Sequence, residues 1–196
     1  MKGSAASVGL FAKTGRAIGV VLSGPPASPR LLERRELTLS SENLPTTVQP
    51  YHAVMELPWP EALSRAQSSV RAIEGLAADS LRRFLRDLAS GGVRVTAVGI
   101  VGSAGRDPAR IGNPHIRAHA AEGQLFRRVL EAAASECGLS HLSFTPGELL
   151  QEAAERIGLA AEDLGARAHA LGKGLVRPWR IEERSATVAA WAALAR

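Results

Sequence analysis

The sequence predicts an α/β protein with a mixed five-stranded sheet, in which a three-strand antiparallel meander and two parallel strands have helices on both faces. Two observations predict this fold class: three β-prone segments precede the first long helical pattern, and short β-rich runs then alternate with helical patterns. At 196 residues, 45% of them apolar, the chain is long enough to bury a sizeable core. We expect one domain over residues 1–158, with a helical C-terminal segment, 159–196, packed on it.

The first three strands follow one another closely. Residues 8–11 and 17–23 are short β-prone runs joined by the glycine-containing connection AKTGR, which is typical of a hairpin. Residues 31–39, LLERRELTL, mix apolar and charged side chains as a half-exposed strand does. These three segments therefore predict the meander.

Residues 40–60 contain four prolines and no sustained period, which predicts a long loop. Loops of this length in compact domains are often functional. The tripeptide PYH at residues 50–52 is the part of this loop that we single out for chemistry.

A long amphipathic helix is expected from Pro60, and Gly91 and Gly92 end it. Its apolar positions step by three and four along one stripe: Leu63, Ala66, Val70, Ile73, Ala77, Leu81, Phe84 and Leu88. The run VRVTAVGIV at residues 93–101 then has the composition of a parallel strand buried on both faces.

A glycine-containing loop over residues 102–112 leads to the next helix, which Asn113 can cap and in which Pro114 can occupy the first turn. This helix is expected to end near Gly138. Residues 142–144 then predict a short fifth strand.

Helices account for the rest of the chain. Thr145 and Glu148 form a capping-box pattern that predicts a helix over 146–157, and further helices are expected over 161–171 and 182–195. Glycine and proline residues separate them: Gly158, Gly172, Gly174 and Pro178.

A meander followed by two right-handed crossovers is the ribonuclease-H-like arrangement. The succession NPHIRAHAAEGQLFRRVLEAAA (113–134), SFTPGELLQEAAERIG (143–158) and an Ala-rich last helix resembles Holliday-junction resolvases of the RuvC type. The chain also resembles an uncharacterised bacterial family with PYH, HxxxHxAEGxLFR and PxW-like segments, here at 50–52, at 115–127 and at the adjacent Pro178 and Trp179. This second resemblance is closer and implies no activity.

The resolvase resemblance does not extend to the chemistry. Such enzymes hold two divalent cations with a carboxylate on the first strand, one at the end of the fourth and a pair on the final helix. No Asp or Glu precedes Glu33, and the fourth strand has none before Asp107. Only Glu182 and Glu183 can stand in for the final-helix pair, so we do not assign a two-metal nuclease site.

The helix that begins near Asn113 has a different set of chemical groups. At about 100° per residue, His115, His119, Glu122 and Phe126 fall within roughly a 60° arc. Two histidines one turn apart can chelate a divalent transition metal, with Glu122 as a third ligand or a general base and His52 from the loop completing the set. In the alternative, structural interpretation, His119 and Glu122 hydrogen-bond each other and His115 is only a polar neighbour of the cap.

An anion site is a third interpretation of the same helix. Its N-terminus presents free N–H groups, and Arg106, Arg110 and Arg117 lie in or next to the preceding loop. A phosphate or a carboxylate can bind such a set without a metal, although the glycines match no nucleotide-binding fingerprint.

The composition of the chain indicates which kinds of binding partner it suits. The chain has 24 Lys and Arg against 19 Asp and Glu, and all but three of the basic residues are Arg, which suits phosphate and carboxylate recognition. A single Cys excludes an intrachain disulfide, and the lack of a signal peptide or a membrane-spanning run predicts a cytoplasmic protein. Two functions stay open: a non-catalytic module that binds a nucleic acid or a protein, and a metal-dependent hydrolase with an unusual His/Glu site.

Overall fold

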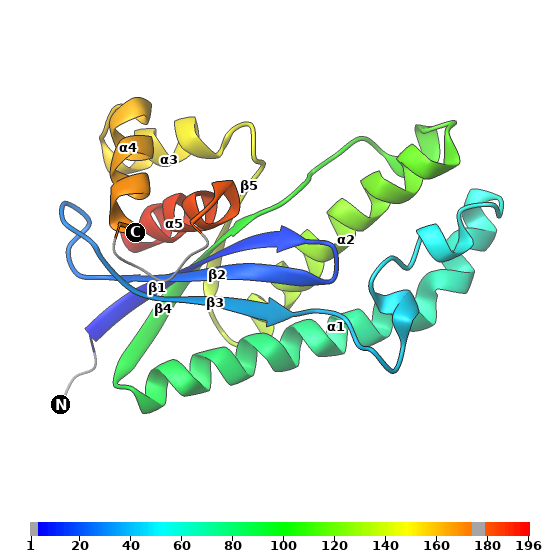
Figure 1. Cartoon of the computed structure of the whole chain (residues 1–196), viewed down its shortest axis with the longest axis horizontal. Coiled ribbons are helices and arrows are strands. Elements are labelled where there is room, and N and C mark those ends of the chain that lie inside the picture. The colour runs from blue at the N-terminus through cyan, green and yellow to red at the C-terminus, as the bar shows by residue number, and fades with distance from the viewer. Residues whose placement is uncertain (1–3, 174–178) are drawn as a thin grey trace.

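The computed structural model describes residues 4–173 and 179–196, which form a five-stranded sheet with the order β3-β2-β1-β4-β5 (Figure 1). The strands are β1 (Ser4–Lys13), β2 (Arg16–Ser23), β3 (Arg30–Thr38), β4 (Val93–Val101) and β5 (Ser140–Phe144). The first three pair antiparallel, whereas β4 pairs parallel with both β1 and β5. The predicted meander and parallel strands are therefore confirmed.

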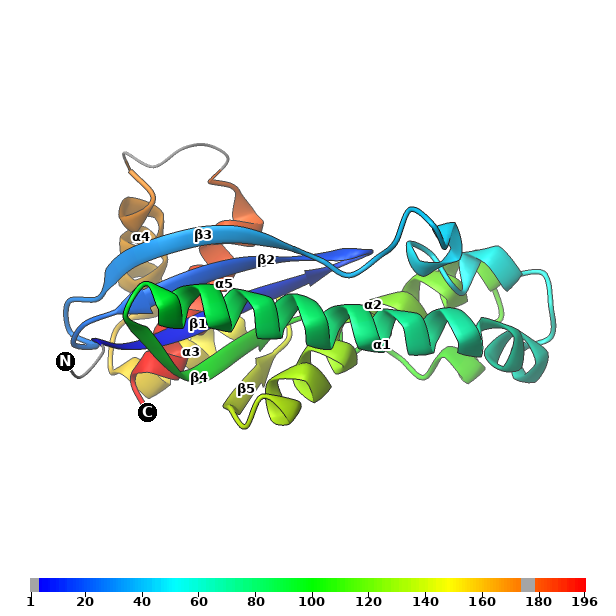
Figure 2. The same cartoon turned by 90° about the horizontal axis from the view of Figure 1, so that it is seen from below.

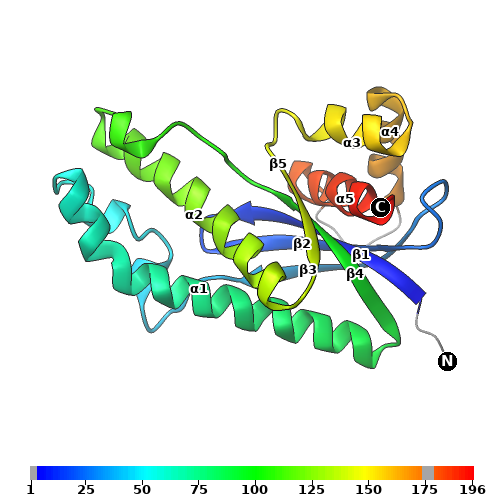
Figure 3. The same ribbon diagram turned by 180° about the vertical axis from the view of Figure 1, so that it is seen from behind.

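Helices cover both faces of this sheet (Figures 1 and 3). One face packs against α1 (Trp59–Ser90) and α2 (Pro114–Glu136), and the buried cluster there includes Val8, Leu10 and Phe126. The opposite face packs against α5 (Ile181–Leu194), with α3 (Leu149–Ile157) and α4 (Ala161–Leu171) outside it. None of the helices in the described chain has both the length and the apolar character that crossing a membrane requires.

The packing of α5 depends on two glycines at the centre of the sheet. A Cβ at Gly9 would overlap the carbonyl group of Ala186, and a Cβ at Gly99 would overlap that of Ala189. The buried Ser7 hydroxyl on β1 also donates a hydrogen bond to the carbonyl oxygen of Ala190, at 2.6 Å. The Ala-rich sequence of α5 thus brings its backbone against the backbone of β1 and β4.

Several boundaries differ from the prediction. β5 begins two residues earlier, at Ser140, and α3 begins at Leu149 instead of Pro146. Thr145 Oγ1 donates to the Glu148 carboxylate at 2.6 Å and accepts from the Glu148 N–H at 3.3 Å, so the capping-box pair closes a turn before the helix. Gly174 and Pro178, which we expected to break the chain between the last helices, lie outside the described residues.

The predicted stripe of α1 is buried along most of its length, but Leu63 is 44% exposed and Ala62 is buried in its place. The reason is the position of the first turns of α1 and α2, which extend past the ends of the strands (Figure 2). The loop after β3 lies beside them and contains two short 3-10 helices, η1 (Pro45–Thr47) and η2 (His52–Val54). This end of the molecule holds the candidate site.

Candidate metal centre

Two segments far apart in the sequence supply the candidate ligands. His52 is the first residue of η2, and His115 and His119 lie one turn apart near the start of α2. The start of α2 is set by Asn113, whose side-chain oxygen accepts the N–H of Ile116 at 3.0 Å, so the predicted cap is confirmed. The cap fixes where α2 begins and therefore where the two histidines of its first turns lie.

The three imidazole rings converge. Their nitrogen ligand atoms all lie within 4.8 Å of one another, and the ring centroids are 4.4 to 5.0 Å apart. His115 Nε2 and His119 Nε2 are 3.1 Å apart. Two nitrogens bound to one tetrahedral zinc ion lie about 3.3 Å apart, so the His115–His119 pair has the spacing of two ligands of one ion.

Glu122 lies behind His52 and holds it. Its carboxylate is buried, with Oε2 2.9 Å from His52 Nδ1, while Oε1 accepts the backbone N–H groups of Tyr51 and His52 at 3.2 and 3.1 Å. A carboxylate accepts hydrogen bonds, so the proton of the neutral His52 ring lies on Nδ1 and the lone pair lies on Nε2. His52 Nε2 is buried and has no hydrogen-bond partner in the described part of the chain.

One interpretation of the sequence was a hydrogen bond between His119 and Glu122 with no metal. The structure shows a different arrangement. Both oxygen atoms of Glu122 contact the Tyr51–His52 segment, and the Nε2 atom of His119 faces that of His115. A carboxylate that orients a histidine from behind is the usual second shell of a metal-binding imidazole.

Burial divides the stripe that these residues share on α2. Glu122 and Phe126 are buried, whereas His115 and His119 are exposed because the first turns of α2 extend past the sheet. The side chain of His52 is only 13% exposed. His52 would therefore hold a metal ion from the protein side, and the exposed His115–His119 pair would hold it on the solvent side.

Aromatic packing keeps the loop in place. The buried Tyr51 ring lies 5.5 Å from the ring of Trp59. The Arg117 guanidinium lies over the Trp59 ring, 5.6 Å from its centroid. The same guanidinium donates a hydrogen bond from Nη1 to the carbonyl oxygen of Ile111 at 3.4 Å. Burial raises the pKa of the Tyr51 hydroxyl, and Arg128 opposes this shift.

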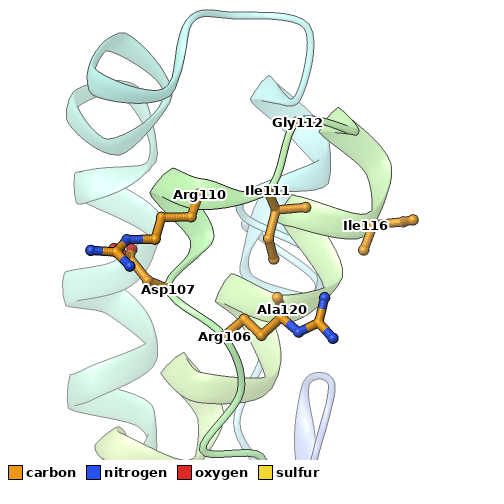
Figure 4. A pocket seen from close by; sticks show the side chains of 7 residues that line it. All are labelled: Arg106, Asp107, Arg110, Ile111, Gly112, Ile116 and Ala120. Carbon is orange, nitrogen blue, oxygen red and sulfur yellow. The ribbon is translucent and has the colours of Figure 1, made fainter.

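Two of the three arginines predicted to bind an anion line the same cavity. Arg106 and Arg110 line an open cavity of about 750 Å³ beside the start of α2 (Figure 4). The other residues that line it are Asp107, Ile111, Gly112, Ile116 and Ala120. Arg117 packs on Trp59 and is not part of this lining.

The acidic residues of α5 are engaged in ion pairs. Glu182 lies 2.6 Å from Lys13 Nζ at the end of β1, and the buried Glu183 lies 2.7 Å from Arg34 Nη2 on β3. Glu183 also accepts the backbone N–H of Arg180 at 2.9 Å. Both carboxylates therefore join α5 to the sheet.

The structure brings together His52, His115 and His119, which the sequence predicted as candidate ligands, but the hydrogen bonds of Glu122 to the loop were not predicted. The backbone N–H of Tyr51 binds Glu122, a contact between residues 71 positions apart. No local pattern in the sequence signals this contact.

No family model matches the chain, and no curated protein matches it in sequence. Among solved structures, the chain is similar to Thermus thermophilus RuvC, with 18% identity over 95% of this chain and 92% of that chain and a TM-score of 0.47. It is also similar to T. thermophilus RuvC in complex with its Holliday junction substrate, with 15% identity, 95% and 91% coverage and a TM-score of 0.51. A member of the Ppx/GppA family from Aquifex aeolicus matches with 12% identity, 79% and 40% coverage and a TM-score of 0.36.

The match to the RuvC complex concerns the fold, and together with the strand order it confirms the predicted ribonuclease-H-like architecture. The chain is thus similar to RuvC in fold.

Proposed function

We propose that this protein binds one divalent transition-metal ion through His52, His115 and His119 and acts as a metal-dependent hydrolase. The observation that supports this proposal is the convergence of three imidazoles, one of which has a buried, unpartnered nitrogen and a carboxylate behind it. Three neutral imidazoles suit zinc, and a site with three protein ligands leaves a fourth position free. A zinc ion held by these residues would supply Lewis-acid chemistry, since zinc acidifies water and polarises oxygen atoms of substrates.

The residues of the chain have separate roles in this proposal. Glu122 keeps the proton of His52 on Nδ1, so that Nε2 is available as a ligand. His115 and His119 leave the outer face of the site open to a substrate because both are exposed. Glu122 is thus a positioning residue in this proposal and not a metal ligand or the general base.

A two-metal nuclease site of the RuvC type is not part of the proposal. β1 and β4 contain no Asp or Glu, and the two acids of α5 form ion pairs with Lys13 and Arg34. We therefore propose that the chemistry lies at the tip formed by η2 and α2, away from the face of the sheet that α5 covers.

Elemental analysis of the purified, untagged protein tests the metal site. We expect one equivalent of zinc in the wild type, and loss of this zinc in the His115→Ala/His119→Ala double variant. The control is His169→Ala, an exposed histidine on α4, which should keep the full equivalent. A wild type that neither retains zinc nor binds it in a titration would rule the proposal out.

The hydrolase step is tested separately on the zinc-loaded protein with chromogenic esters and phosphodiesters. Hydrolysis should disappear with the zinc and in the double variant, and it should persist in His169→Ala. Zinc binding without hydrolysis of any of these substrates would favour the second candidate.

The second candidate is a non-catalytic module that binds a nucleic acid or a protein. It is supported by the formal charge of +5, by the Arg-lined cavity and by a structural neighbour that was solved with a Holliday junction. This candidate predicts that the protein binds DNA or RNA and that its affinity falls steeply as the salt concentration rises, because binding releases counterions from the phosphates.

A further inference from the structure

The Arg-lined cavity adjoins the candidate metal centre on the same two turns of α2. Ile116 and Ala120 line the cavity, and each directly follows one of the two exposed histidines in the sequence. Adjacent residues of a helix lie about 100° apart around an axis whose full diameter is about 10 Å. A ligand in the cavity therefore lies on the face of α2 next to the His115–His119 pair.

The charge of this cavity favours an anion. Arg106 has no ion-pair partner among the residues that the structure describes, and its side chain extends along the cavity below Ala120 (Figure 4). Arg110 lies against Asp107, with Nε 3.7 Å from the carboxylate, but both side chains are highly exposed. An exposed pair of this length contributes roughly 0 to 1 kcal/mol, so a phosphate can compete for Arg110.

The loop that presents Arg106 is fixed against α2. Gln124 on α2 donates a hydrogen bond from Nε2 to the carbonyl oxygen of Arg106 at 2.8 Å. Gly105 has a positive φ of 50°, and a Cβ at this position would crowd the same Gln124 amide. Asp107 caps η3 (Pro108–Arg110) by accepting the N–H of Ala109 at 3.0 Å. The backbone that carries Arg106 and Arg110 is thus held in place before a ligand binds, which lowers the entropic cost of binding.

The rest of the lining has no charged side chain and is made by Ile111, Gly112, Ile116 and Ala120. Ile116 is 57% exposed, so it offers an uncovered surface to a ligand. Guanidinium groups beside such a surface suit a phosphate that is attached to an apolar or aromatic group.

We infer that this cavity binds the phosphate group of a phosphate ester and places the ester beside the metal centre. The inference rests on the proposed function and names its substrate class. The same chemistry is found in small phosphate esters and in the phosphodiester chain of a nucleic acid.

Calorimetric titration of the zinc-loaded full chain with phenyl phosphate tests this inference. Arg106→Gln should weaken binding about tenfold, because a charge-assisted hydrogen bond is lost. Asp107→Asn should tighten binding a few-fold, because a like charge is removed while asparagine can still cap η3. The matched control Arg94→Gln, an exposed arginine at the opposite end of β4, should leave binding unchanged. Equal affinity of the wild type and Arg106→Gln would overturn the inference.

Cobalt substitution measures whether the phosphate lies beside the metal. In the cobalt-loaded protein, the ³¹P relaxation of bound phenyl phosphate should increase strongly, and the increase should vanish in Arg106→Gln. Bound phosphate without this increase would overturn the placement. A short single-stranded oligodeoxynucleotide that competes with phenyl phosphate would identify a nucleic acid as the source of the ester, whereas competition by small esters alone would identify a small substrate.

The two proposals fail in different ways. Cobalt absorption bands that depend on His115 and His119, with no binding of phenyl phosphate, would overturn this inference and leave the metal centre intact. Phenyl phosphate binding that depends on Arg106, in a protein that never binds cobalt or zinc, would overturn the proposed hydrolase and with it the substrate role of the cavity.

Discussion

Glu122 is a buried carboxylate whose contacts are three N–H groups of one short segment. Among the described residues, the only side chain that it contacts by a hydrogen bond is that of His52. A buried carboxylate is costly unless hydrogen bonds compensate for the lost water, and here all of these bonds orient the Tyr51–His52 segment. The position of His52 therefore depends on one side chain of α2.

Replacing Glu122 by Gln tests this dependence. The amide oxygen can still accept the two backbone N–H groups, but the charged acceptor for His52 Nδ1 is lost. We expect zinc affinity to fall about 10- to 100-fold, which is typical for a partner of a metal-bound histidine, with the overall fold retained. A competition titration with a chelator measures the change. Glu136→Gln, an exposed change at the end of α2, should have no effect, and unchanged affinity in Glu122→Gln would contradict this role.

The individual residues of this site could be predicted from sequence, but their partners could not. Helical spacing placed His115, His119 and Glu122 on one stripe, because that spacing is a local property of α2. The contact of Glu122 with His52 depends on how a loop some 70 residues away folds back, and no local pattern encodes that path. For the same reason, the partition of the stripe into buried and exposed parts was not predictable.

At the scale of elements, the close approach of α5 to the sheet sets a strict limit on side-chain size. Gly99→Ala should destabilise the protein by about 3 kcal/mol, because the new Cβ overlaps the backbone of Ala189 and α5 has to move. The control is Gly75→Ala in α1, where a Cβ meets nothing within 4 Å and should stabilise the helix by about 1 kcal/mol. Urea denaturation measures both changes. A Gly99→Ala protein as stable as the wild type would refute the packing.

Elements were predicted best where a local chemical signal marks their ends. Asn113 and Pro114 gave the start of α2, and glycines gave the end of α1. The predicted start of α3 was wrong because Thr145 and Glu148 close a turn before the helix, with the same hydrogen bonds that a capping box uses. Leu63 was assigned to the core because periodicity does not show that α1 extends past the sheet.

At the scale of the whole molecule, two carboxylates join helices on opposite faces to the sheet. Glu131 on α2 accepts hydrogen bonds from Arg127 and from Ser143 on β5, and Glu182 on α5 accepts from Lys13 on β1. Burial acts to raise the pKa of Glu131, but the bonds from Ser143 and Arg127 outweigh it and hold this pKa below its usual 4.5. The hydrogen bond from Lys13 likewise lowers the pKa of Glu182.

The lowered pKa values of Glu131 and Glu182 determine how the stability of the fold depends on pH. Because both folded-state pKa values lie below the unfolded value of 4.5, the stabilisation is fully present above that pH and is lost as the pH falls through the folded values. We expect the free energy of unfolding to decrease below pH 4.5, and we expect this decrease to be smaller in a Glu131→Gln/Glu182→Gln double variant. Chemical denaturation at a series of pH values measures it. An identical acid slope in the two proteins would contradict the assignment.

The hydrogen bond between Ser7 on β1 and Ala190 on α5 joins residues that are 183 positions apart in the sequence. It links the first strand of the sheet to the last helix that packs on it. During synthesis the N-terminal strands leave the ribosome first. Until α5 emerges, the glycine-containing face of β1 and β4 stays bare, together with the side chains of Val20, Leu22 and Val101 that α5 and its neighbours later bury. A nascent chain stalled before α5 therefore presents an apolar sheet face to chaperones and proteases.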